Sequence, residues 1–110
     1  MKAVRVAHII DNHSLVLNVG RSDGIETGQR FLVYGLSDDE ITDPETGRSL
    51  GYLELVRGTG SVSYIQDEMC VITSDKPVPA STTAMVRAIS GTVEYQPFTS
   101  PAVGDYAREI

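Results

Sequence analysis

The stretch "NVGRSDGIETGQRFLVY", residues 18–34, places three glycines four positions apart between two apolar runs. Such glycines suit a phosphate-binding loop, a close helix contact or a turn between strands. A phosphate-binding loop needs two glycines five positions apart, followed by Lys and then Ser or Thr, whereas Gly24 and Gly28 are four apart and Gln29 follows. A G-x-x-x-G helix contact belongs to an apolar membrane segment, which the charges in this stretch exclude. The turn between strands remains.

In a turn between strands, each of the three glycines has a role. Gly20 ends one strand, Asp23-Gly24 forms a tight turn, and Gly28 leads into the next strand. Glycine is used where the backbone needs a positive φ or a close approach. We therefore expect a positive φ at Gly24, with Ile25 filling the core between the strands.

Apolar runs of strand length extend on both sides of this turn. Punctuated by Gly and Asp, they predict strands at residues 4–10, 15–19, 30–36, 50–58, 60–66 and 69–74. The first two strands form a hairpin around the turn residues 11–14, with Val4, Val6 and Ile10 on one face. No helix of ten or more residues is predicted before Asp75.

The sequence "SDDEITDPETGRS", residues 37–49, separates the third and fourth predicted strands. Pro44 presets a backbone angle that suits a turn, and Gly47 supplies a residue that tolerates positive φ. Ile41 and Leu50 flank this turn on either side. We therefore expect a protruding β-arm rather than an irregular loop.

The end of the chain repeats a local pattern. "AVGDYA", residues 102–107, resembles "IETGQRF", residues 25–31, in having an apolar residue, a gap, Gly, a polar residue and an extended run. We expect the strand that follows Gly104 to pair with residues 4–10. The complete prediction is an all-β chain that forms a single domain over 1–110. Its fold is a small antiparallel β-barrel, SH3-like or OB-like, of about six to seven strands.

The segment near 75–98 is irregular in sequence and is expected to be a connection or an arm. From residue 76 to residue 98 it is too long for a hairpin loop, and it carries apolar residues that need cover: Met85, Val86, Ile89, Val93, Tyr95 and Phe98. We expect this segment to pack against a second subunit, which would make the protein a homodimer. The alternative is a loop in a monomer.

Composition limits the classes of partner. The net charge is −6, with only nine Lys and Arg among 110 residues. Nucleic-acid affinity comes largely from cations that neutralise phosphates, and anionic membrane surfaces attract the same cations. We therefore expect neither nucleic acid nor a membrane as partner. No apolar run reaches the roughly 20 residues that a membrane helix needs.

The acidic cluster at 38–45 is the strongest candidate for a metal site. A calcium loop needs Gly at its sixth position and a bidentate Glu at its twelfth. Counting from Asp38, these positions hold Asp43 and Ser49. We therefore expect a solvated arm and no metal.

Other reactive residues lack the neighbours that their chemistry requires. His8 and His13 have no third ligand in sight, and the single Cys70 can form neither an internal disulfide nor a cysteine metal site. Gly60-Ser61 lacks the second Gly of a nucleophile elbow, and no helix follows. We expect a non-enzymatic protein without a cofactor, with Cys70 as a small core residue.

Three segments together resemble a known family: "LVLNVGRSDGIETGQRFLVY" (15–34), "ITDPETGRSLGYLELVRGTGSVSYIQ" (41–66) and "PFTSPAVGDYAREI" (97–110). Their D-G-x-x-x-G turn, D-P-x-T-G turn and terminal V-G-D are similar to the C-terminal domain of the flagellar assembly protein T family. Related β-modules occur in curli-secretion lipoproteins. The resemblance implies an SH3-like barrel in an assembly or interaction domain of the cell envelope, without catalytic residues.

Two functions follow as expectations. The first is a protein-interaction or assembly module. The alternative is a nucleic-acid- or translation-associated barrel, because "VRGTGSVSYIQ" resembles turns of ribosome- and RNA-polymerase-associated β-modules, and Tyr52, Tyr64, Arg57 and Arg87 offer aromatics and cations. The first residues, "MKAVRVAHIIDNHS", lack the uninterrupted apolar core of a signal peptide. As written, the chain is expected to be cytoplasmic, whereas the family resemblance suggests the cell envelope.

Overall fold

The computed structural model describes residues 2–78 and 94–110, which form an all-β fold with one antiparallel sheet. The six strands lie in the order β1-β2-β5-β4-β3-β6. Their bounds are β1 (Val6–Asp11), β2 (Ser14–Leu17), β3 (Arg30–Thr42), β4 (Ser49–Ile65), β5 (Cys70–Ser74) and β6 (Tyr106–Glu109). The only helix in the described ranges is a three-residue 3-10 turn, η1 (Arg21–Asp23). The prediction of an all-β antiparallel chain is therefore confirmed.

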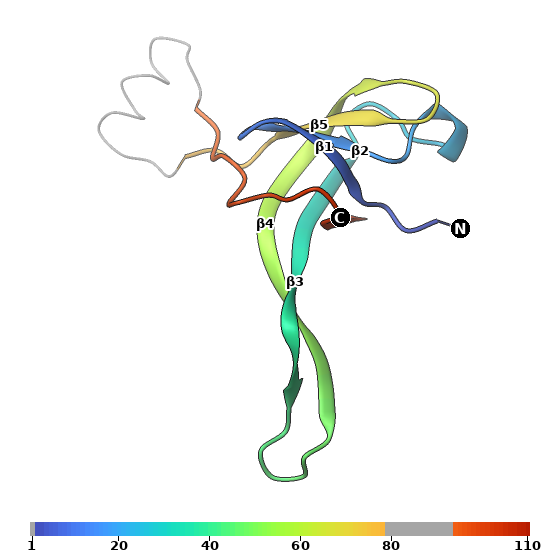
Figure 1. Ribbon diagram of the computed structural model, residues 1–110. Coiled ribbons are helices and arrows are strands. Elements are labelled where there is room, and N and C mark those ends of the chain that lie inside the picture. Colours follow the sequence, from blue (N-terminus) through green and yellow to red (C-terminus); the bar gives the residue numbers. More distant parts are fainter. Residues whose placement is uncertain (1, 79–93) are drawn as a thin grey trace.

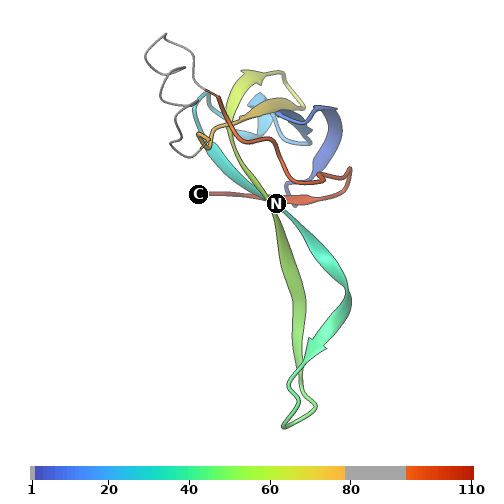
Figure 2. The ribbon, with the colours of Figure 1, turned by 90° about the vertical axis from the view of Figure 1, so that its left-hand side faces the viewer.

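Strands β3 and β4 are long and curved, and they connect two different parts of the molecule (Figure 1). Their upper halves lie against β1, β2 and β5 in a body. Their lower halves leave the body together as a two-stranded arm that ends in the turn 43–48 (Figures 1 and 2). The predicted β-arm is thus present, with Gly47 at φ 73 and its amide donating to the Asp43 carbonyl. Pro44 lies in the same turn.

The core of the body follows from period-two alternation. In β3 Phe31 and Val33 are buried while Arg30 is exposed, and in β5 Cys70 and Ile72 are buried. Alternate residues of a strand point to opposite faces, so each strand contributes one apolar row. The buried apolar residues are Val6, Leu15, Leu17, Val19, Phe31, Val33, Val62, Cys70, Ile72, Phe98 and Ala107.

Phe98 enters this core from a distant part of the chain. Its ring covers β4 at two glycines: a Cβ added at Gly58 or Gly60 would lie 3.0 or 3.1 Å from the ring. Phe98 therefore lies in the core of its own chain, which corrects the expectation that it packs against a second subunit. The other predicted contacts of residues 79–93 lie outside the described residues, and the predicted dimer stays a prediction.

β4 corrects the expectation of separate strands at 50–58 and 60–66. It runs without a break for 17 residues, because its glycines lie under Phe98 rather than ending the strand. The register with β3 shifts between Val33↔Gly58 and Tyr34↔Val56, which leaves Arg57 as an extra residue. An extra residue of this kind bends a strand, so one strand serves both the body and the arm.

The first hairpin is confirmed, with β1 paired to β2, but its predicted face is wrong at one position. Val6 is buried, whereas Ile10 is exposed. Register shifts between Val6 and His8 and between Ile9 and Asp11 break the alternation that would bring Ile10 to the core.

The described strands do not close into a barrel. β6 pairs with β3, from Phe31↔Glu109 to Tyr34↔Tyr106, and its predicted pairing with residues 4–10 is present only over residues 4–6. Toward β1 it forms a single isolated bridge, Arg5↔Tyr106. Three backbone hydrogen bonds accompany this bridge, including one of 2.7 Å from the Val6 amide to the Asp105 carbonyl.

The glycines of residues 18–34 adopt the roles of a turn. Gly24 has φ 82, as the Asp-Gly pair predicts, and follows η1. The Asp23 carboxylate accepts a hydrogen bond of 3.0 Å from the Gly20 amide. Gly20 lies beyond the end of β2 rather than within it, and a Cβ there would lie only 2.3 Å from the Gln66 carbonyl oxygen. Gly20 is therefore required by a close backbone approach.

The two similar turns precede neighbouring strands. Gly28 has φ 91 and precedes β3, and Gly104 has φ 95 and precedes β6. In each case the glycine lies two residues before the first residue of the strand. The two similar sequence patterns thus precede β3 and β6, which pair with each other.

Candidate protein-interaction surface

Residues 36–56, here called the arm, gather most of the exposed apolar surface. Thirteen large apolar side chains are exposed in the described ranges, and seven of them belong to the arm. These seven are Leu36, Ile41, Leu50, Tyr52, Leu53, Leu55 and Val56. A contiguous apolar patch on a soluble protein marks an interaction site more often than a chance exposure.

One face of the arm continues the core. Phe31, Val33 and Gly35 alternate along β3 and are all buried. Gly35 is opposite Leu55 on β4, and cross-strand partners share a face of the sheet. Leu53, two residues along, shares this face by the same alternation. The apolar row of the core thus extends past the body as Leu55 and Leu53, which are exposed.

The opposite face of the arm is also apolar. Tyr34 is opposite Val56, and Leu36 is opposite Glu54. Near the body this face is covered by β6: the rings of Tyr34 and Tyr106 stack at 5.8 Å, and the Arg108 guanidinium lies 5.0 Å from the Tyr34 centroid. Arg108 also binds both oxygens of Glu54 at 2.9 Å. Farther out, no strand of the sheet covers this face.

An ion pair holds the root of the arm. The Arg57 guanidinium donates to the Asp105 carboxylate at 3.2 Å, and both side chains are largely shielded from water. The same carboxylate accepts a 2.8 Å hydrogen bond from the Ala102 amide. Gly35 makes room for this pair, because a Cβ there would lie 2.6 Å from Arg57 and 2.9 Å from Asp105. The extra residue of β4 is therefore used to tie the arm to the C-terminal segment.

The outer part of the arm is acidic. Over residues 36–56 the sequence has six Asp and Glu and one Arg, a net −5 of the chain's −6. Five of the carboxylates belong to the predicted acidic cluster, Asp38, Asp39, Glu40, Asp43 and Glu45. Glu40 is opposite Tyr52, so charge and apolar surface lie side by side. Within residues 2–78 and 94–110, no three His, Cys, Asp or Glu side chains come together to hold a metal ion.

A second polar cluster lies in the body, around Asp75. Its carboxylate accepts hydrogen bonds from Arg30 at 2.8 Å, from Thr59 at 2.7 Å and from Ser61 at 2.6 Å. The hydrogen bond from Arg30 holds the pKa of Asp75 well below its usual range, and the two hydroxyls add to this effect. Asp75 thus joins β3 to β4 at the end of β5. No sequence pattern marks this cluster, because its members are spread over 46 positions of the chain.

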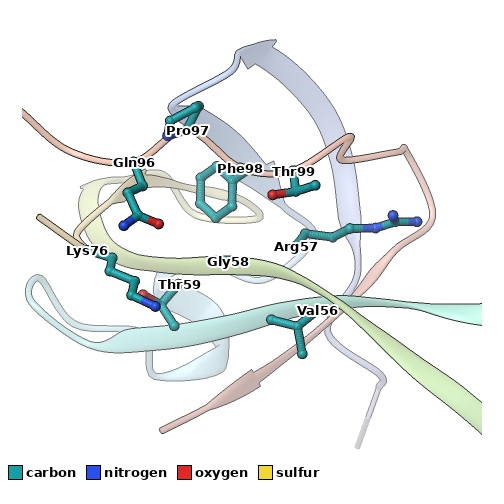
Figure 3. A pocket seen from close by; sticks show the side chains of 9 residues that line it. All are labelled: Val56, Arg57, Gly58, Thr59, Lys76, Gln96, Pro97, Phe98 and Thr99. Carbon is teal, nitrogen blue, oxygen red and sulfur yellow. The ribbon is translucent and has the colours of Figure 1, made fainter. Parts of the chain in front are cut away.

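A shallow pocket of 170 Å³ lies beside the root of the arm. Figure 3 shows Phe98 as its apolar wall, with Gly58 below the ring and Lys76 and Gln96 on one side. The charged group on this side is Lys76, and Arg57 points away toward Asp105 (Figure 3). The pocket is smaller than the roughly 300–1,000 Å³ of typical ligand pockets, so it carries less functional information than the arm.

The remaining candidates from the sequence do not form a common site. His8 and His13 are exposed, and His13 bonds the Tyr95 carbonyl at 3.1 Å. Cys70 is fully buried, and this burial raises the pKa of its thiol to about 11. It is the small core residue that the sequence predicts.

The aromatics of the nucleic-acid alternative are far apart. Tyr52 and Tyr64 are both exposed but lie at opposite ends of β4, roughly 40 Å apart at about 3.3 Å per residue. Arg57, between them, is engaged by Asp105. Arg87 lies outside the described residues.

Comparison with models of protein families and with characterised proteins finds no match for this sequence. In the part of the chain that the structure describes, no helix is long and apolar enough to cross a membrane. A functional assignment must therefore rest on the surface features of this protein.

Proposed function

We propose that this protein is a non-enzymatic interaction or assembly module that docks onto a protein partner through its arm. One observation carries the proposal: the arm is apolar on both faces, and seven of its large apolar side chains are exposed. Large exposed apolar side chains on a protruding hairpin are an aggregation hazard. Their concentration on the arm is therefore best explained by a partner that covers them.

The arm is also firmly attached to the body. It shares both strands with the body, so it has no flexible linker at its base. The Arg57–Asp105 pair and the Tyr34–Tyr106 stack brace its root on opposite faces. A braced element loses less conformational freedom on binding than a free loop does.

We also propose that the body is an SH3-like barrel, of the type that the resemblance to the flagellar assembly protein T domain implies. The segment before β6 supports this assignment. Its Phe98 amide donates to the Asn12 carbonyl and its Thr99 amide to the Arg57 carbonyl, both at 2.7 Å. The segment thus joins the β1–β2 turn to β4. At the seam that a closed sheet would need, between the edge strands β1 and β6, the Val6 amide donates to the Asp105 carbonyl at 2.7 Å.

Co-purification of the full chain from its native cells, with quantitative mass spectrometry, tests the interaction. The variant Leu53→Ser/Leu55→Ser removes apolar surface from one face of the arm. The matched control is Val103→Ser, which changes an exposed apolar residue of the C-terminal segment. We expect a partner that is retained by the wild type and the control and lost by the arm variant. Equal recovery by all three proteins would contradict docking through the arm.

A further inference from the structure

We propose that a single protein partner clasps the arm on both faces, in a cleft that is apolar at its centre and carries Lys and Arg at its rim. This inference rests on the proposed function and adds the chemistry of the partner. Three observations lead to it: the apolar side chains on opposite faces, the charge of the arm, and the lack of an ion-pair partner, among the described residues, for the five carboxylates at 38–45.

Apolar side chains on both faces of the arm require a partner with a cleft rather than a flat surface. Leu53 and Leu55 project from one face of β4, and Tyr52 and Val56 project from the other. All four are exposed. A flat partner surface would cover one face and leave the other in water. A cleft that takes the hairpin between two walls covers both.

The negative charge of the arm indicates which side chains the partner's cleft should carry at its rim. None of the five carboxylates at 38–45 has an ion pair within the described residues. Burying an unpaired carboxylate costs free energy, and a cation supplied by the partner offsets that cost. Cations at the rim of the cleft would meet these carboxylates while its centre meets the leucines.

The same charge disfavours two other occupants. Two arms packed together in a dimer would bring a net −5 against −5, and like charges across an interface are repulsive. An anionic membrane surface attracts basic segments and would repel this arm. A protein with a cationic rim fits both the apolar and the acidic features.

Site-specific photocrosslinking in the native cell tests the cleft. The photoreactive residue p-benzoylphenylalanine replaces Leu53 on one face or Val56 on the other, and Val103 in a control. We expect both arm positions to crosslink the same partner, at different segments of it, well above the Val103 control. Crosslinks from only one face, or to a second copy of this chain, would overturn the proposal.

A charge variant tests the rim. Asp39→Asn/Glu40→Gln removes two arm carboxylates, and Glu26→Gln/Glu68→Gln removes two from the body as a matched control. We expect the first variant alone to lower the crosslinking yield by about three- to tenfold, with a similar fall for the wild type at raised salt. Crosslinking from both faces that is insensitive to salt and to charge would refute the cationic rim but keep the arm as a docking element. No crosslinking above the control from either face would refute both proposals.

Discussion

The two halves of β3 and β4 both contain rows of apolar residues, but these residues lie in opposite environments. In the body, Phe31 and Val33 of β3 are buried under neighbouring strands. In the arm, Leu53 and Leu55 of β4 continue the same face and are exposed. Apolar content does not separate the two halves. What separates them is that the pairing with β5 and β6 does not extend into the arm: the pairs nearest to the arm are Gly60↔Ser74 and Tyr34↔Tyr106.

This difference indicates two kinds of apolar residue in one strand pair. Those in the body stabilise the fold, because unfolding would expose them to water. Those in the arm are already exposed in the isolated chain, so their apolar surface contributes to folding very little. Stability measurements should therefore separate the two halves: substitutions of buried apolar residues in the body should cost much more free energy of unfolding than substitutions in the arm.

Phe98→Ala should give the largest loss. Phe98 is buried and covers Gly58 and Gly60, which have no side chains to fill the space that a smaller residue would leave. Removal of a buried Phe ring costs about 3–5 kcal/mol. Urea unfolding followed by circular dichroism measures this change. If Phe98→Ala unfolds within about 1 kcal/mol of the wild type, Phe98 does not serve the core as the structure indicates.

Gly24→Val and Gly47→Val compare the same strain in the two regions. Both glycines have a positive φ, 82 and 73, and neither has an atom within 4 Å of an added Cβ. Gly24→Val should cost about 1–3 kcal/mol, because a β-branched residue is strained in this conformation. Gly47→Val should cost less, because the end of a two-stranded arm can open locally and relieve the strain. Equal losses in thermal unfolding would mean that the arm unfolds only together with the body.

Asp75→Asn should make the stability of the body less dependent on pH. The folded pKa of Asp75 is lowered, chiefly by its hydrogen bond from Arg30. Its ionised form therefore stabilises the fold above the unfolded pKa of about 3.9, and this contribution is lost as the pH falls below that value. At pH 7 we expect a loss of about 1–3 kcal/mol from the weakened charged hydrogen bonds. The difference from the wild type should narrow as the pH falls below about 4.

The matched control for Asp75 lies in the arm. Asp38 has no ion pair within the described residues, so Asp38→Asn should leave the free energy of unfolding nearly unchanged at pH 7. A difference between Asp75→Asn and the wild type that stays constant from pH 7 to acid conditions would show that the charge of Asp75 is not what stabilises the fold.

Local chemistry predicted a large part of this structure. The positive φ at Gly24, the hairpin of β1 and β2, and the β-arm around Gly47 each depend on a few neighbouring residues. The strand turns at Gly28 and Gly104 follow from the same kind of local pattern.

Features that join distant positions escaped prediction. Phe98 meets Gly58 and Gly60 only because the chain returns to β4. Asp75 gathers Arg30 and Ser61, whose spacing in the sequence follows no periodic pattern. The continuity of β4 was missed because its glycines resemble strand ends until the Phe98 ring is placed over them.

The sequence predicted a protruding, solvated arm but not the exposure of its apolar side chains, because alternation predicts which side chains share a face but not what covers that face. In the body another strand or Phe98 covers it. On the arm no described residue covers Leu53 and Leu55 fully, and both remain exposed.

Leu53→Ala should change the stability least among these apolar substitutions, because the Leu53 side chain is already exposed in the arm. The reference is Leu17→Ala, a change of the same residue type at a fully buried position of β2. Leu17→Ala should cost about 2–5 kcal/mol, as buried leucines do. Leu53 is 54% exposed, so Leu53→Ala should stay within about 0.5 kcal/mol of the wild type.

Urea unfolding of the wild type, Leu17→Ala and Leu53→Ala at one low protein concentration measures these differences. A loss above about 1 kcal/mol for Leu53→Ala would mean that the arm is covered in the isolated protein. Its dependence on protein concentration would then show whether a second copy provides that cover.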